Sequence, residues 1–299
     1  MTHAPLPLLR AGAVILLRPG GRIQVGFDPD RAVIIDPPAH VAPDRLTALL
    51  RSLTGPQTSE DTAARAAAAG LSVDEIRELL DQLVDAGIAH HSRAVLTPMR
   101  IRVHGAGPLA DAVTTALSGP EFSVRQSVRR PRLFDGEVDP ITHEDRMVTW
   151  ATDLVILTDF LAHDPWLVSS LMRHRIPHLM VRLRDGTGVI GPMVLPGLSS
   201  CLHCADHHRR DRDRDWPIVS AQLLGQSGWA GSATIAGTAA IVQGEVEHIA
   251  AATRPDRRET GDLPAPASLD ATIEFRADPS ALVIRGWSPH PLCGCRLPE

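Results

Sequence analysis

The sequence predicts an α/β protein in which a small winged-helix-like α+β module precedes a domain with a mostly parallel sheet. Over residues 100–252, short apolar strand-like runs alternate with helical stretches, which is typical of a parallel sheet. A glycine-rich turn follows the first of these strands and opens a helix. All four cysteines form two close-spaced pairs late in the chain, which is typical of a structural zinc site. We expect two domains, residues 1–97 and 98–299.

The front module is expected to contain strands, three helices and a closing strand. Turn signals rich in proline, glycine and aspartate separate the strands. Ser72 and Glu75 are spaced as a capping box at the start of the third helix, and Gly87 ends that helix. The expected strands are residues 13–17, 23–27, 32–35 and 88–96, and the expected helices are residues 43–53, 59–69 and 73–86.

A winged-helix shape usually indicates DNA binding, but the third helix is acidic. An acidic face repels nucleic-acid phosphates, so a groove that binds a peptide fits the charge better than a DNA site. The hypothesis that the protein is a DNA-binding regulator therefore rests on the winged-helix-like shape alone. The charged residues of this helix are Asp74, Glu75, Glu78, Asp81 and Asp85, against Arg77 as the one cation.

The second domain is expected to alternate strands and helices and to end in an antiparallel pair. A continuous apolar run, residues 153–159, is typical of a buried parallel strand. The expected strands are residues 100–103, 122–128, 153–159, 177–181, 271–275 and 282–285; the helices are residues 108–117, 165–174 and 234–252; residues 186–191 form a turn-rich return and 256–266 a loop.

The glycine-rich turn has the pattern G-x-G-x-x-A between a strand and a helix, the Rossmann-like context that holds nucleotide phosphates. Gly105 and Gly107 are the candidate residues. A tight turn without a nucleotide is the alternative. After the next strand, arginines stand where an acid would bind a ribose, and Asp135 is the nearest acid. Asp159, at the end of a later strand, is expected from its position alone to be a helix N-cap at the carboxyl edge of the sheet.

The cysteine pairs are Cys201 with Cys204 and Cys293 with Cys295. Together they offer the four thiolates that tetrahedral zinc prefers, and two disulfides are the alternative. If zinc binds all four, no thiol remains to act as a nucleophile. Three histidines nearby are expected to lie beside the metal rather than to bind it, and three aromatic residues to lie in the core. These residues are His203, His207 and His208, and Trp229, Trp287 and Phe275.

Composition excludes several function classes. The chain contains no lysine, asparagine or tyrosine, so it has no Schiff-base lysine and no P-loop lysine. The net charge of -5 gives no basic field for nucleic acid or membranes. The run at 209–214 alternates arginine with aspartate and predicts a solvated face. No signal peptide or membrane span is evident, and we expect a cytoplasmic protein.

Over residues 100–299 the order of motifs resembles the E1-like family of ThiF and MoeB proteins and ubiquitin-activating enzymes. The resemblance implies a Rossmann-like E1-type domain with a zinc site, and a homodimer. The front module resembles the RiPP-recognition-like element of the branch that makes bacteriocins and azoline peptides. The matching segments are residues 105–110, 157–159, 175–178 and 196–204, with the glycine-rich return to Gly191.

Active E1-like enzymes use an acid for the ribose, then an asparagine, an arginine and a lysine for ATP. This chain has no asparagine or lysine, and residues 128–146 do not show the pattern. The resemblance therefore implies a degenerate ATP/Mg²⁺ site and a non-catalytic zinc protein. Such a protein would bind a leader-type peptide and present it to a cyclodehydratase or another modifying enzyme. An active adenylyltransferase that uses Mg-ATP is the alternative, with Gly105, Gly107 and Asp159 in the site.

Overall fold

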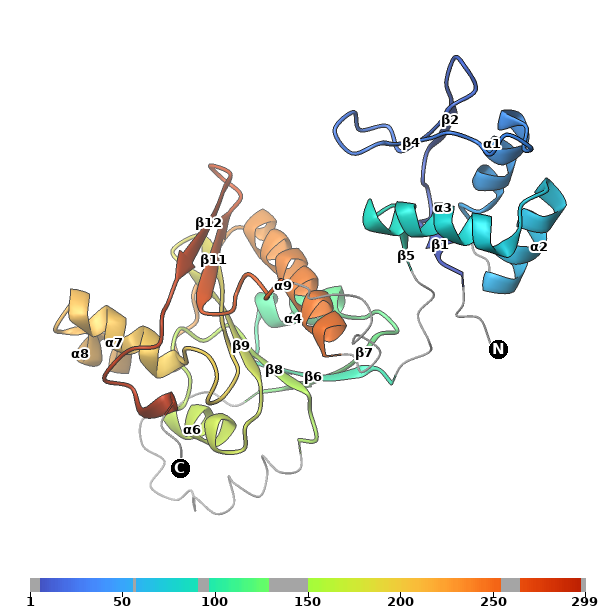
Figure 1. Ribbon diagram of the computed structural model, residues 1–299. Coiled ribbons are helices and arrows are strands. Elements are labelled where there is room, and N and C mark those ends of the chain that lie inside the picture. The colour runs from blue at the N-terminus through green and yellow to red at the C-terminus, as the bar shows by residue number, and fades with distance from the viewer. Residues whose placement is uncertain (1–5, 56–57, 91–96, 129–149, 254–263, 297–299) are drawn as a thin grey trace. The chain divides into compact units, whose positions relative to one another are not determined.

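The computed structural model describes residues 6–55, 58–90, 97–128, 150–253 and 264–296 (Figure 1). The chain divides into two compact units, Met1–Leu96 and Thr97–Glu299. No helix in these described ranges is long and apolar enough to cross a membrane.

The described residues of the first unit form three helices and two small antiparallel sheets. The expected strands and helices are present, with shorter strands than the sequence predicted. Strand β1 was not predicted; it pairs with β5. Of the closing strand expected at residues 88–96, residues 91–96 lie outside the described residues. The elements are β1 (Leu8–Leu9), β2 (Ile15–Leu17), β3 (Ile23–Val25), β4 (Val33–Ile35), α1 (Pro43–Ser52), α2 (Ser59–Ala69), α3 (Val73–Asp85) and β5 (Ala89–His90).

Local sequence sets the helix boundaries of this unit. The capping box of α3 is present: the Glu75 backbone N–H donates to Ser72 Oγ at 3.2 Å, and the Ser72 N–H donates to Glu75 Oε2 at 2.8 Å. The same arrangement begins α2. Apolar side chains at helical spacing then bury one face of each helix. The largest fully buried side chains of this core are Ile23, Leu46, Leu50, Leu53, Ile76, Leu80 and Leu83.

The second unit is built on a seven-stranded sheet of order β12-β11-β10-β9-β8-β6-β7. Strands β7, β6, β8 and β9 are parallel, and β10, β11 and β12 continue the sheet as antiparallel strands. Their bounds are β6 (Met99–His104), β7 (Phe122–Ser127), β8 (Leu154–Leu157), β9 (His178–Arg184), β10 (Thr187–Val194), β11 (Ala271–Arg276) and β12 (Ala281–Gly286). The parallel strands and the closing antiparallel pair confirm the predicted α/β class.

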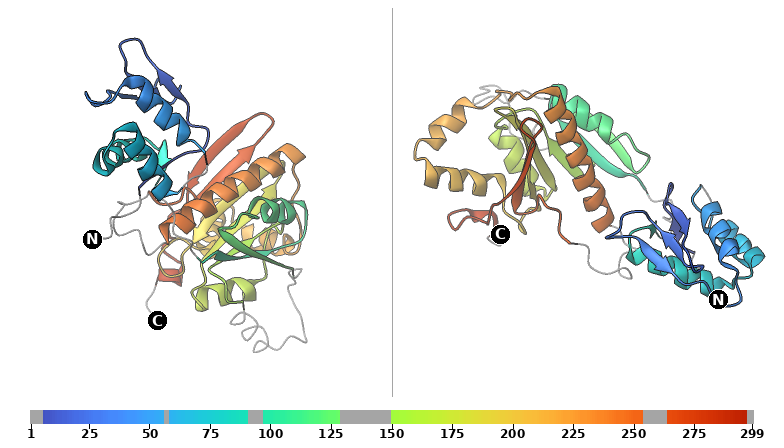
Figure 2. Two further views of the ribbon diagram at one scale, coloured as in Figure 1. Left: turned by 90° about the vertical axis from the view of Figure 1, so that its right-hand side faces the viewer. Right: turned by 90° about the horizontal axis from the view of Figure 1, so that it is seen from above.

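Helices cover both faces of this sheet (Figure 2). Helices α4 (Pro108–Ala116) and α9 (Ser232–Ala252) bury the largest apolar core against one face, around Val103, Ile156 and Val242. Helix α6 (Pro165–Arg173) packs on the other face, around Leu157 and Met180. The carboxyl ends of the parallel strands thus meet the start of α4 at one edge.

The turn-rich return expected at residues 186–191 is wrong. Most of it belongs to strand β10, and the turn itself lies at Asp185 and Gly186, both at positive φ. The prediction was wrong because it interpreted the glycines as turn residues. Gly188 instead lies in a strand, where a Cβ would meet the Thr238 side chain on α9. Helices α7 (Leu202–Arg212) and α8 (Trp216–Gln222) were not predicted. The loop expected at 256–266 lies mostly outside the described residues.

Candidate functional site

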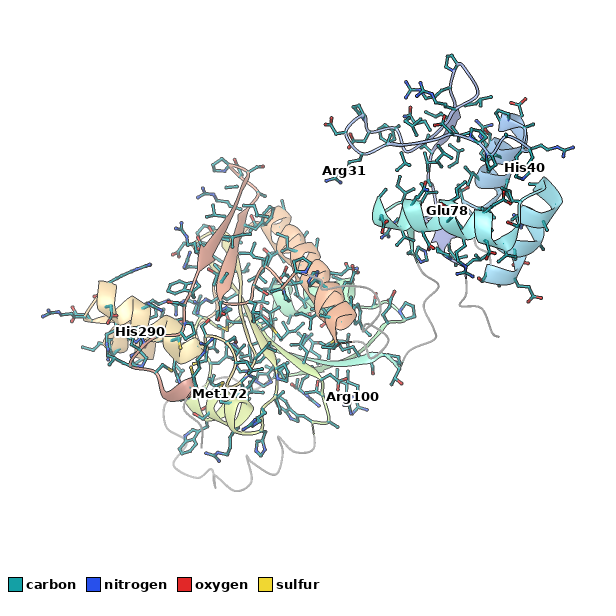
Figure 3. All side chains as sticks on the ribbon, in the orientation of Figure 1. Arg31, His40, Glu78, Arg100, Met172 and His290 are labelled. Atoms are coloured by element: carbon teal, nitrogen blue, oxygen red, sulfur yellow. The ribbon has the colours of Figure 1, made fainter. Side chains whose placement is uncertain are left out.

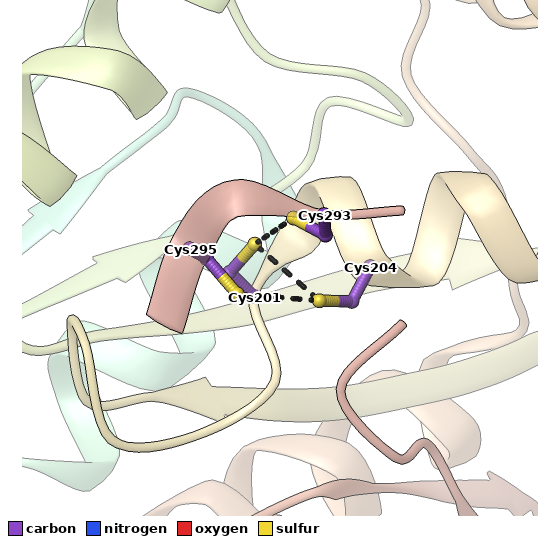
Figure 4. Close-up of side chains that lie close together, drawn as sticks. All are labelled: Cys201, Cys204, Cys293 and Cys295. Carbon is purple, nitrogen blue, oxygen red and sulfur yellow. Dashed lines mark hydrogen bonds between the residues drawn. The ribbon is translucent and has the colours of Figure 1, made fainter. Parts of the chain in front are cut away.

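The four cysteines converge although their pairs lie about ninety positions apart (Figure 4). Cys201 Sγ lies 3.8 Å from Cys204 Sγ and 3.6 Å from Cys293 Sγ, and Cys204 Sγ lies 3.5 Å from Cys295 Sγ. A zinc tetrahedron with Zn–S bonds of about 2.3 Å has sulfur–sulfur edges of about 3.8 Å. All four sulfurs lie within 4.8 Å of one another, so the cluster could hold a metal such as zinc.

The distances and the electrostatics of this cluster both fit a metal better than disulfides. A disulfide needs about 2.05 Å between sulfurs, and all four thiols are free. Burial raises the pKa of Cys201, and burial with the neighbouring thiols raises the pKa of Cys295 to about 12. Four thiolates crowded together in this way need a cation to stabilise their charge, which is what zinc supplies when bound.

The segment that carries the second cysteine pair is fixed to α7 by hydrogen bonds. His290 Nε2 lies 2.8 Å from Asp211 Oδ2, and His208 Nε2 lies 2.8 Å from the Ser288 carbonyl oxygen. Figure 3 shows His290 beside α7. His207 stacks on His290, and His203 is exposed. Among the described residues, the metal-ligand cluster contains cysteines alone.

The glycine loop and Asp159 meet at the carboxyl edge of the sheet. A Cβ at Gly107 would lie 2.8 Å from Asp159 Oδ1, and one at Gly105 would lie 3.0 Å from Asp159 Oδ2 and 2.6 Å from the Thr158 carbonyl oxygen. The structure therefore brings the three candidate nucleotide residues together. It also shows that contact with Thr158 and Asp159 is enough to require both glycines, without a nucleotide.

Asp159 is buried and strained, and it is not a helix N-cap. Asp164 caps α6 instead, since its side chain accepts the Trp166 N–H at 2.9 Å. Asp159 has φ +64°, is 5% exposed, and its Oδ2 has no hydrogen-bond partner among the described residues. Burial raises the pKa of the Asp159 carboxyl, while the backbone N–H groups of Leu109 and Ala110 favour its charged form.

Histidines near this edge were missed by the sequence analysis. His104 ends β6, its Nδ1 lies 3.0 Å from Ser127 Oγ, and its ring lies 6.2 Å from the His163 ring. His163 is buried, and burial lowers its pKa to about 3. A lone histidine in a polar-looking loop gives no sequence signal. Asp135 and most of residues 128–146, where ribose and ATP contacts were sought, lie outside the described residues.

Two further expectations are wrong. Trp229 was expected in the core but is 67% exposed, whereas Trp287 is buried. Arg209 was expected on a solvated face, but its side chain is 16% exposed. It pairs with Asp206 at 2.9 Å and packs against the Trp216 ring, so only the later part of that charged run is solvated.

No family model and no curated protein matches this chain. Solved structures do match it in fold. A heterocyclase in complex with substrate and cofactor has a TM-score of 0.65 at 14% identity, and the heterocyclase TruD has 0.65 at 13%. These matches cover 98% and 97% of this chain but only 39% and 42% of the heterocyclases, so the chain spans about two fifths of their length.

The microcin C7 biosynthetic enzyme MccB, in complex with N-formylated MccA, has a TM-score of 0.57 at 13% identity, covering 97% of this chain and 99% of MccB. E. coli MccB with ATP has a TM-score of 0.56 at 12% identity over the same shares. At these identities the likeness is one of fold alone. That fold agrees with the E1-like fold that the sequence resemblance implies.

Proposed function

We propose that this chain is a non-catalytic peptide-binding protein of RiPP biosynthesis, which presents a peptide to a modifying enzyme such as a cyclodehydratase. The observation that carries the proposal is the position of Asp159 against the glycine loop. The start of a helix attracts anions, and the phosphates of a nucleotide would use that place. Here a buried carboxylate already stands against Gly105 and Gly107.

The composition supports the same conclusion. A nucleotide phosphate beside Asp159 would need cations to offset the repulsion, and the chain has no lysine, so only arginine could supply them. It also lacks the asparagine that active E1-like enzymes use. All four cysteines lie in the metal cluster, so none is left for a thioester. We expect the zinc to hold the C-terminal segment on α7, because the four thiolates leave no open position for a substrate.

The front unit supplies the surface that we propose for peptide binding. Helix α3 presents Asp74, Glu78, Asp81 and Asp85 around Arg77, so four carboxylates face solvent against one guanidinium. Figure 3 shows Glu78 on this helix. The sheet β2-β3-β4 has short edge strands to which an extended peptide can add. This charge favours a basic peptide and opposes nucleic acid.

One observation favours the alternative, an adenylyltransferase that uses Mg-ATP. Asp159 Oδ2 is buried and has no partner among the described residues, and an orphaned carboxylate oxygen is a suitable ligand for magnesium. In neighbours of this fold, E. coli MccB has been solved with ATP. The homodimer expected from the resemblance remains a prediction under either function.

Calorimetric titration of the zinc-loaded full-length protein with ATP and magnesium separates the two functions. We expect no heat and no exchange of labelled pyrophosphate into ATP. Micromolar binding with exchange would overturn the non-catalytic proposal and establish the adenylyltransferase. Binding of Mg-ATP without pyrophosphate exchange would also contradict the argument that the Asp159 carboxylate keeps nucleotide phosphates away from the glycine loop.

A random 20-residue peptide display library tests the peptide surface. Selection on the full-length protein is expected to enrich basic peptides that lose binding in the Glu78→Lys variant. The matched control is Glu60→Lys on α2, which is equally exposed to solvent but does not lie on the α3 face. Failure to enrich, or equal binding to both variants, would contradict the proposed surface.

A further inference from the structure

A cleft of about 250 Å³ lies between the α7–α8 pair and the sheet of the second unit. Its apolar walls come from the loop after β8, from α6, β9 and α7, and from the end of α8. This volume falls below the roughly 300–1,000 Å³ of pockets for drug-sized ligands, so any ligand is small. The apolar residues that matter most are Leu161, Val168, Met180, Leu202 and Leu224.

Arg182, on β9, carries a positive charge into this cleft. Its Nη1 donates to the Leu161 carbonyl oxygen at 2.7 Å, but its buried Nε has no partner. In the described part of the chain, no carboxylate lies within 4.0 Å of its guanidinium. Burial, with a smaller effect of Arg209, lowers the pKa of Arg182 to about 9, so the group stays charged at pH 7.

The carboxylate nearest in the cleft wall is already engaged. Asp206 Oδ1 accepts from Arg209 Nη1 at 2.9 Å and from Trp216 Nε1 at 3.1 Å. Its hydrogen bonds therefore go to Arg209 and Trp216, whereas its charge favours protonated Arg182 without a direct contact and less strongly than burial opposes it. A buried charge without a direct counter-ion is destabilising by several kcal/mol, and such groups in native proteins normally have an ion or ligand beside them.

His163 lines the same cleft with unsatisfied polar atoms. Its side chain is buried, and neither ring nitrogen has a hydrogen-bond partner among the described residues. Burial lowers its pKa to about 3, so the ring is neutral at pH 7 and carries one N–H donor. A buried donor without an acceptor is destabilising, and a ligand that accepts its hydrogen bond removes that cost.

We propose that this cleft binds a small apolar carboxylate, which pairs with Arg182 and accepts a hydrogen bond from His163 while its apolar part contacts Met180 and Leu161. A carboxylate would give Arg182 the direct ion-pair partner that it lacks among the described residues, and its two oxygens match the fork of a guanidinium. The apolar walls exclude water and strengthen the pair. The ligand is either a free acid or the last residue of a peptide.

The proposal stands apart from the proposed function, because the cleft is lined by the second unit alone and does not include the glycine loop. Two probes distinguish the two sources of carboxylate: 4-methylpentanoate, and an acetylated tripeptide that ends in leucine with a free carboxylate. The same tripeptide with a C-terminal amide, and 4-methylpentan-1-ol, keep the apolar part and remove the charge.

Binding is measured by calorimetry on the zinc-loaded full-length protein. We expect at least one carboxylate probe to bind, and its neutral analogue to bind at least about tenfold more weakly, since hydrogen bonds to charged groups contribute about 1.5–3 kcal/mol. Arg182→Met is expected to lose at least about tenfold in affinity. Arg184→Met is the matched control, since Arg184 lies on the same strand and pairs with Glu274 at 2.9 Å outside the cleft.

A second variant keeps the test valid if Arg182→Met does not fold. Ala221→Trp places a large ring at the cleft wall on α8 and is expected to abolish binding while leaving Arg182 in place. Binding of the free acid alone indicates a small metabolite, and binding of the tripeptide alone indicates a peptide terminus; both support the proposal. It is overturned if no carboxylate binds at 10 mM, about the weakest binding that calorimetry resolves, if the neutral analogues bind equally well, or if Ala221→Trp binds as wild type.

Discussion

Replacing Asp159 by asparagine removes the charge that, in our proposal, keeps nucleotide phosphates away from the glycine loop. The side chain keeps its size, so Gly105 and Gly107 keep their close contacts. A phosphate at the loop would lie near the space that a Cβ of Gly107 would fill, which is 2.8 Å from Asp159 Oδ1. We take about 4 Å as the separation between the charge of that phosphate and the charge of the Asp159 carboxylate.

The magnitude follows from Coulomb's law. Two unit charges about 4 Å apart repel by about 4 kcal/mol at an effective dielectric constant of about 20. Each 1.4 kcal/mol corresponds to about tenfold in affinity, and solvent screens part of the repulsion. We therefore expect Asp159→Asn to bind ADP, without magnesium, at least about tenfold more tightly than the wild type.

The assay is calorimetric titration without magnesium and without a chelator, because a chelator would remove zinc. Asp111→Asn is the matched control, since Asp111 lies in the first turn of α4 but is exposed, and we expect a change of less than about threefold. Equal binding of ADP to wild type and Asp159→Asn would refute the repulsion argument. Magnesium-dependent binding that is lost in Asp159→Asn would show that the carboxylate binds a metal instead.

Three further predictions concern the metal, the pH dependence and the glycine loop. The protein is expected to hold about one zinc ion per chain, measured by metal analysis. The Cys295→Ser variant is expected to lose this zinc, and its Tm in scanning calorimetry should fall by more than about 10 °C. Full retention of zinc by the variant would contradict the proposed set of four cysteine ligands. Burial lowers the pKa of His178 to about 4, so the unfolded state binds its proton first, and stability is lost as the pH falls from about 6.5 towards 4. We expect the His178→Asn variant to show a smaller dependence of the unfolding free energy on pH in that window, by up to about 1.4 kcal/mol per pH unit. An unchanged dependence would contradict the lowered pKa of His178. Gly105→Ala should destabilise the protein by about 1–3 kcal/mol through contact with Thr158, whereas Gly244→Ala inside α9, with open space around it, should stabilise it by up to about 1 kcal/mol in urea unfolding.

Features that depend on neighbouring residues were predictable from the sequence. The capping box of Ser72 and Glu75 fixed the start of α3, and the spacing of apolar residues fixed the buried face of each helix in the first unit. The acidic face of α3 and the absence of lysine and asparagine are also properties of the sequence alone. They constrain the binding partners and the chemistry whatever the fold.

The cluster of four cysteines was predictable for a different reason. Cys201 and Cys293 lie 92 residues apart, yet the pairing of every cysteine with a near neighbour is a strong chemical signal that needs no knowledge of the path between them. The sequence left zinc and disulfides open; the sulfur–sulfur distances are too long for disulfides and leave a cluster that could hold a metal such as zinc.

Tertiary structure alone decided how Asp159 and Arg182 are used. The sequence showed an acid after a strand and an arginine directly after the strand expected at residues 177–181, but not what faces either side chain. Asp159 meets a loop 54 residues earlier in the chain, and Arg182 meets a cleft completed by helices α7 and α8, which the sequence analysis did not predict. Periodicity and capping report local backbone preference, whereas burial and charge compensation depend on segments that only folding brings together.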